Sequence, residues 1–203
     1  MVASLLTAAG SANAIPFEGN SIGEWVNPDH DGNDSGSFSR DDNGTAANSV
    51  HLFSWGYPDP SILAFDRVGS DDLDAQPGWT TEAGETFQIG TIWYHNGING
   101  SSTADGVTGI DLSLQLEITN PDLGLTDDFT FELGMLNTPN RWWKIPDYVF
   151  EEDFFSDTTL VIDDAVYSLR LLGFRDAGGL QTEGYSDYLK SNEGRTRRAG
   201  LYA

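Results

Sequence analysis

Alternation of apolar and polar residues is the main structural signal in this chain. Over residues 110–119, Ile and Leu occupy every second position, and Asp, Ser, Gln, Glu and Thr fill the positions between them. Residues 129–135 repeat the pattern with Phe129, Phe131, Leu133 and Met135. A period of two places successive side chains on opposite faces of a strand. The two segments are therefore predicted to be strands with one buried face each, and to pair antiparallel across the connection that begins at Asn120.

Short apolar segments recur along the rest of the chain between runs rich in Gly, Pro, Asn and Asp. They predict further strands at residues 50–55, 62–68, 86–96, 159–162 and 166–174. No long segment has a helical period, although residues 148–155 have room for one or two helical turns. Seven or more short strands with one polar face each predict an all-β fold, a two-sheet antiparallel β-sandwich of the jelly-roll type.

The 203 residues fit one domain with a leader and a tail. Residues 1–14 carry no charge and end in Ala12-Asn13-Ala14, the A-x-A form of a signal-peptidase site. We expect a signal-peptide remnant at 1–14, with a short apolar helix of the fold as the alternative. The sandwich is expected at 15–180. A polar, basic and unstructured tail is expected at 181–203, where the alternation stops. The alternatives are that the tail pairs with the acidic body or continues into an attachment segment. The predicted location is secreted or at the cell surface.

Charge and composition exclude several classes of partner. Against 10 Lys and Arg stand 32 Asp and Glu, a net charge of −22, which repels nucleic-acid phosphates and anionic lipid headgroups. We therefore expect no nucleic-acid partner. No later segment reaches the roughly 18 to 20 apolar residues of a membrane helix, so we also expect no direct membrane insertion. The absence of cysteine excludes disulfides and thiolate chemistry. Cations are the natural partners, and solubility in a salty medium is the other interpretation of this charge.

An acidic, glycine-containing run at residues 27–34 has the N-x-D-x-D-G form of a calcium loop. An EF-hand is excluded because Phe38 occupies position twelve, where a bidentate Glu is required, and no helical pattern flanks the run. A different calcium loop remains open, and the alternative is a solvated acidic turn. The candidate ligands are Asn27, Asp29, Asp31, Asp34, Asp41 and Asp42.

Two pairs of residues are candidates for recognition or catalysis. Adjacent residues of an extended chain point to opposite sides, so one indole of Trp142-Trp143 is expected in solvent, available to a glycan or a surface protein. The alternative is that a neighbouring loop covers both. Glu117 and Glu132 lie on neighbouring predicted strands and face away from the core, as the paired carboxylates of some glycosidases do. Outward carboxylates are also expected by chance on so acidic a chain.

A series of short motifs resembles the choice-of-anchor K family of bacterial exported proteins. They are FSWG at 53–56, SILAF at 61–65, FQIGTIWYHNG at 87–97, IDL at 110–112 and NTPN at 137–140, and together they cover roughly residues 49–175. The resemblance implies a secreted surface module of the kind that is paired with different carboxy-terminal anchoring segments. It carries no catalytic residues.

These patterns together predict an exported, non-catalytic β-sandwich module that acts in adhesion or assembly at a cell surface or in an extracellular matrix. Its expected partner is an extracellular glycan, a surface protein or a second copy of the chain, and calcium is its candidate ion. A carbohydrate-binding module is the first alternative. A glycan-cleaving enzyme that uses Glu117 and Glu132 is the second.

Overall fold

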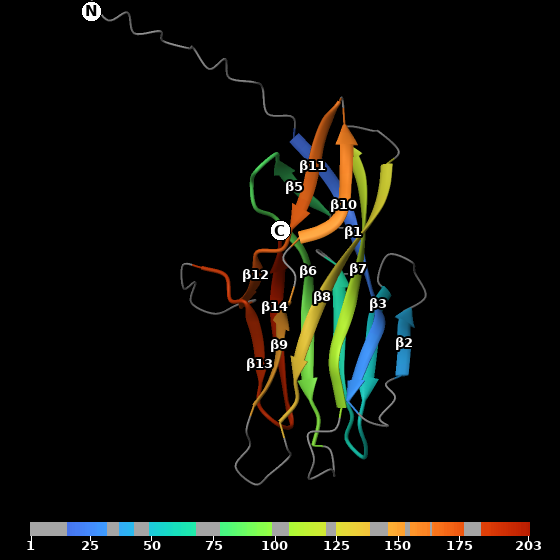
Figure 1. The fold of residues 1–203 in the computed structure, drawn as a ribbon, viewed down its shortest axis with the longest axis vertical. Helices are drawn as coiled ribbons and strands as arrows, with labels where there is room; N and C mark the ends of the chain where they lie inside the picture. Colours follow the sequence, from blue (N-terminus) through green and yellow to red (C-terminus); the bar gives the residue numbers. More distant parts are fainter. Residues whose placement is uncertain are drawn as a thin grey trace, which may run out of the picture.

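The chain folds into antiparallel sheets (Figure 1). The computed structural model describes residues 16–31, 37–42, 49–67, 78–98, 106–120, 125–138, 146–152, 155–162, 164–176 and 184–203. Within these ranges all the named secondary-structure elements are β-strands. The prediction of an all-β antiparallel fold is therefore confirmed. No helix in these ranges has the length and apolar character needed to cross a membrane.

The first sheet, sheet A, has six strands in the order β13-β9-β8-β7-β1-β5. Its central strands are long, and all of its pairings are antiparallel. Its strands are β1 (Pro16–Asp31), β5 (Trp79–Glu82), β7 (Gly106–Asn120), β8 (Leu125–Leu136), β9 (Asp147–Glu151) and β13 (Tyr188–Ser191).

The second sheet, sheet B, has six strands in the order β12-β14-β6-β4-β3-β2. Its pairings are also antiparallel. Its strands are β2 (Ser37–Asp42), β3 (Ser49–Trp55), β4 (Ser61–Arg67), β6 (Gln88–Asn96), β12 (Gly173–Asp176) and β14 (Arg195–Tyr202).

One apolar core lies between the two sheets, as in a β-sandwich. The predicted pair of strands is confirmed, because Leu112 of β7 lies opposite Phe131 of β8 and both side chains are buried. Sheet B contributes buried rings, among them Phe65 of β4. This ring packs so closely against Gly23 of β1 that a Cβ at position 23 would overlap it. A glycine is therefore required where the two sheets approach each other at this point.

A two-stranded ribbon stands apart from the two six-stranded sheets, and the two-sheet prediction did not contain it. It consists of β10 (Phe155–Ile162) and β11 (Ala165–Arg170), and Figure 1 shows it at the end of the molecule where β1 begins and β5 lies. An isolated two-stranded ribbon is marginally stable in water, so contact with the sandwich must stabilise it. Tyr167 supplies one such contact, edge-on to Phe17 of β1 with ring centroids 5.5 Å apart.

Residues 148–155, which had room for helical turns in the sequence, contain the edge-proximal strand β9 instead. That interpretation of the segment is wrong, because β9 is paired on both sides, with β8 and with β13. The period-two alternation of buried and half-buried residues over Asp147–Glu151 agrees with a strand. The predicted strand at 166–174 is divided in two, since β11 ends at Arg170 and β12 begins at Gly173, whose φ is 113°.

The prediction of an unstructured polar tail at 181–203 is also wrong. The segment contains β13 at the edge of sheet A and β14 inside sheet B, between β12 and β6. The exposed arginines of β14 precede Ala199 and Leu201, which are buried in the core. A strand paired on both sides has its backbone hydrogen bonds satisfied even where its side chains are polar, so the basic residues do not prevent the segment from entering the sheet.

Candidate functional site

In strand β9 the usual distribution of side chains is reversed, because carboxyl groups face the core and aromatic rings face outward. Asp147, Val149 and Glu151 are buried, whereas Tyr148 and Phe150 lie on the outer face of sheet A and are half-buried. Burying a carboxyl group is costly unless it has partners, so this orientation needs a local explanation.

Asp147 has partners from two segments, one nine residues earlier in the chain and one on the opposite sheet. Its Oδ1 accepts hydrogen bonds from the backbone N–H of Thr138 and from Thr138 Oγ1, each at 2.7 Å. The hydroxyl of Tyr94, on β6 of the opposite sheet, donates to Oδ2 at 3.5 Å. Burial raises the pKa of Asp147, and the bonds from Thr138 and Tyr94 act in the opposite direction. The Asp147 carboxyl thus joins sheet A to sheet B and holds β9 in its orientation.

Glu151 is buried with less support. Neither of its carboxyl oxygens has a hydrogen-bond partner among the described residues. Burial, with a smaller contribution from the nearby charge of Asp187, raises the pKa of Glu151 to about 7, while Arg170 lowers it. A substantial fraction of this carboxyl group is therefore protonated at neutral pH.

The outward side chains next to β9 form a continuous apolar patch, which we name the aromatic platform. It has two rungs across β8, β9 and β13, since Leu136 and Lys190 flank Tyr148, and Gly134 and Tyr188 flank Phe150. Leu136 and Tyr188 are 52% and 47% exposed. The platform comprises Leu136, Tyr148, Phe150, Tyr188 and Lys190.

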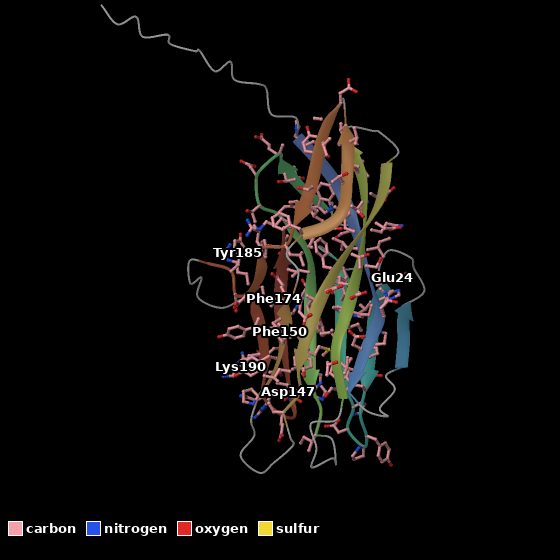
Figure 2. All side chains as sticks on the ribbon, in the orientation of Figure 1. Glu24, Asp147, Phe150, Phe174, Tyr185 and Lys190 are labelled. Carbon is pink, nitrogen blue, oxygen red and sulfur yellow. The ribbon has the colours of Figure 1, made fainter. Side chains whose placement is uncertain are left out.

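The rings of the platform pack on one another and on the sheet. Tyr148 and Tyr188 meet edge to face with centroids 5.6 Å apart, and Lys190 Nζ lies 5.7 Å from the centroid of Tyr148. The Phe150 ring covers Gly134 so closely that a Cβ there would overlap it. Figure 2 shows Phe150 and Lys190 on the same long side of the molecule, with Glu24 on the opposite side. The platform is thus a packed surface near the edge of sheet A.

A cavity of about 390 Å³ lies between the ribbon and the end of sheet A. We name it the ribbon pocket. Apolar and aromatic side chains line it from both sides, chiefly Phe17, Trp79, Phe87, Leu116, Phe129 and Tyr167. Its volume lies in the range of small-molecule sites, about 300 to 1,000 Å³.

The structure describes part of the predicted calcium segment, and that part is strand. Asn27, with a φ of 48°, and Asp29 lie at an irregularity where β1 shifts its register against β7. Asn27 donates a hydrogen bond from Nδ2 to Asp111 Oδ2 at 2.9 Å. In the described ranges no three His, Cys, Asp or Glu side chains are grouped so as to hold a metal ion.

The remaining candidate ligands are dispersed or lie outside the described ranges. Asp31 is the last residue of β1 in sheet A. Asp41 and Asp42 end β2, opposite Val50 and Ser49 in sheet B. The two groups of aspartates therefore belong to opposite sheets. Asp34 lies outside the described residues.

The register separates the two candidate catalytic carboxylates. Glu132 lies opposite Asp111 and Glu117 lies opposite Thr126, which places the glutamates six residues apart along the β7–β8 ladder, about 20 Å. Paired glycosidase carboxylates are about 5 to 9.5 Å apart. Glu117 and Glu132 are outward-facing, as predicted, but they do not form a catalytic pair.

Trp142 and Trp143 lie outside the described residues, as do residues 1–14, so the indole and leader predictions stay predictions. The platform residues Tyr148, Phe150 and Tyr188 were missed in the sequence. A signal for them was present, because Tyr148-Val149-Phe150 is too apolar for a strand with one wet face. It marks a strand with apolar groups on both sides.

Comparison with known proteins adds no relative. No family model matches the chain, and no curated protein is significantly similar to it. The resemblance to the choice-of-anchor K family thus rests on the order of the short motifs alone, and the fold and the two surfaces described above carry the functional argument.

Proposed function

We propose that this chain is an exported, non-catalytic β-sandwich module that attaches to an extracellular surface or matrix, in adhesion or assembly, through the aromatic platform. One observation carries the proposal: β9 buries two carboxyl groups and places two half-buried aromatic rings on the outer face of the sheet. Folding alone favours the reverse arrangement, since it would bury the rings and hydrate the charges. The cost of the observed orientation is explained if the outward rings bind a partner.

The chemistry of the platform fits recognition by contact rather than by catalysis. Aromatic residues are enriched in protein interfaces because they offer large contact area at a small loss of side-chain freedom. Lys190 adds one positive charge beside Tyr148 on a chain whose net charge is −22. An anionic or hydroxyl-rich partner therefore meets a locally favourable charge on an otherwise repulsive molecule.

A carbohydrate-binding module is the second candidate, and the position of the Phe150 ring favours it. Because Gly134 has no side chain, the ring covers the strand rather than standing away from it. An aromatic face held in this way can stack on the apolar face of a sugar ring. The partner is then a glycan, whereas in the leading proposal it is a surface protein or a second copy of the chain.

The test compares matched tyrosine variants. We expect Tyr188→Ala to weaken attachment at least tenfold, because interface anchors of this type contribute about 2 kcal/mol or more. The control is Tyr57→Ala, the same change at a tyrosine that is 85% exposed in the connection between β3 and β4. A glycan array detects carbohydrate binding, immobilised matrix proteins detect adhesion, and sedimentation velocity detects self-association.

The result decides among these partners. Loss of glycan binding in Tyr188→Ala alone selects the carbohydrate-binding module, and loss of protein binding or self-association selects adhesion or assembly. Equal behaviour of Tyr188→Ala and Tyr57→Ala in all three measurements overturns the proposal.

Calcium remains the candidate ion for the 27–42 segment. A cation that binds only the folded state adds about 2.7 kcal/mol when its concentration is a hundred times the dissociation constant. We expect calcium to raise the melting temperature more than sodium chloride of equal ionic strength, and Asp29→Asn with Asp31→Asn to remove that increment. If the double variant responds to calcium as the parent does, the segment does not bind it.

A further inference from the structure

The ribbon pocket differs from the aromatic platform in position and in chemistry. Its walls come from both sides of the space between the ribbon and sheet A. Leu160 and Tyr167, which are paired across the ribbon, line one side, and Leu116 and Phe129 of β7 and β8 line the other. The pocket is partly open to solvent, and its volume of about 390 Å³ lies in the range of small-molecule sites, about 300 to 1,000 Å³.

Polar residues of the pocket gather on its exposed rim. Glu82 ends β5, Glu85 lies in the connection between β5 and β6, and β11 supplies Ser168 and Arg170. All four residues are exposed. Two carboxylates at the rim of a chain with a net charge of −22 disfavour an anionic ligand, although Arg170 offsets part of this locally.

Trp79 belongs to the pocket wall, and its side chain is buried. Its indole Nε1 has no hydrogen-bond partner among the described residues, but the atom is enclosed by protein and is not open to the pocket. The side chain therefore adds apolar contact area to the wall.

The ribbon is also the part of the fold best able to admit a ligand. Among the named strands, β10 and β11 pair only with each other, whereas every other strand belongs to a six-stranded sheet. Local opening is easiest where few strands share the backbone hydrogen bonds. Ile162 of the ribbon is buried in the core, so such opening is partial and leaves this residue in place.

We infer that the ribbon pocket binds an uncharged, lipid-like molecule with an apolar chain. The apolar walls take the chain, and the acidic rim selects against an anionic head group. The ribbon covers the bound molecule.

The first experiment measures the site with N-phenyl-1-naphthylamine, an uncharged fluorophore that brightens in apolar surroundings. Leu160→Trp fills the pocket from the ribbon, and we expect it to weaken fluorophore binding at least tenfold. Val161→Trp is the matched control, since Val161 is the next residue of β10 and is 58% exposed. Absence of binding to the parent protein, or equal binding by the two variants, overturns the inference.

The second experiment identifies the ligand class by displacement of the fluorophore. We expect 2-decanone, which is uncharged, to displace it more effectively than decanoate, which has a chain of the same length and is anionic. Decanoate binding as tightly as 2-decanone, or more tightly, contradicts the proposed ligand.

Discussion

Strands β7 and β9 belong to the same sheet and face the same core, yet they place their apolar and carboxyl side chains on opposite faces. On β7 the Leu and Ile side chains point inward and Asp, Ser, Gln and Glu point outward. On β9 the carboxyl groups of Asp147 and Glu151 point inward and two aromatic rings point outward. At the centre of the sheet, β7 buries its apolar side chains and exposes its polar ones, as folding favours. Near the edge of the sheet, β9 has the opposite arrangement, and the outer surface of the sheet is apolar there.

The largest expected effect lies on the β7 side of this comparison. Leu112 is fully buried between the sheets, and Leu112→Ala removes apolar contacts and leaves a cavity, which costs about 2 to 5 kcal/mol. Ser113→Ala, at the next and more exposed position, should change stability by less than about 0.5 kcal/mol. Urea denaturation of both variants measures the contrast. Equal losses of stability in the two variants would show that the core-facing and outward-facing positions of β7 do not differ in burial as the structure has them.

A smaller loss is expected where β9 buries Asp147. Asp147→Ala removes the acceptor for the backbone N–H and the hydroxyl of Thr138, and leaving these donors unpaired costs about 1 to 3 kcal/mol. Asp147→Asn keeps a carbonyl oxygen in place and should recover much of this loss. If Asp147→Asn is as unstable as Asp147→Ala, the hydrogen bonds to Thr138 do not set the orientation of β9.

The second buried carboxyl should make stability depend on pH. The pKa of Glu151 is about 7 in the folded protein against an ordinary value of 4.5, so folding takes up a proton between these two pH values. The free energy of unfolding should therefore fall as pH rises from about 4.5 to about 7, by of order 1 to 2 kcal/mol.

Glu151→Gln should remove this decline, and Glu152→Gln, at the exposed neighbouring position, should retain it. Chemical denaturation at several pH values between 4 and 8 provides the measurement. A decline that is the same in Glu151→Gln and Glu152→Gln would assign the pH dependence to other groups.

The smallest effect on stability is expected on the outer face of β9. Phe150→Ala removes cross-strand contacts with Gly134 and Tyr188, which contribute about 0.2 to 1 kcal/mol each at most. The same variant should lose binding of the platform's partner in the measurements described for Tyr188→Ala. A loss of stability comparable to that of Leu112→Ala would mean that the outward rings serve the fold and not a partner.

The period of two in the sequence was sufficient to predict two strands of sheet A. It identified the inward residues of β7 and β8 and their antiparallel pairing, because alternation and a short connection leave one compatible arrangement. The short apolar segments between turn-rich runs identified most of β3, β4 and β6. Neither pattern identified β14, whose first half is exposed and basic, because a strand in the interior of a sheet can be polar on its outer face.

Alternation in the sequence thus determined the all-β class and which face of the central strands is buried, because burial of apolar side chains acts on each strand separately. The tertiary structure alone decided which way β9 faces and where β14 pairs. Asp147 can be buried only because Thr138 and Tyr94 supply its hydrogen bonds, and Tyr94 comes from the opposite sheet. β14 pairs with β6, about a hundred residues earlier in the chain, through backbone groups that are the same in every residue. Such long-range partners leave no local signal, so the aromatic platform and the ribbon pocket emerged only when the sheets were assembled.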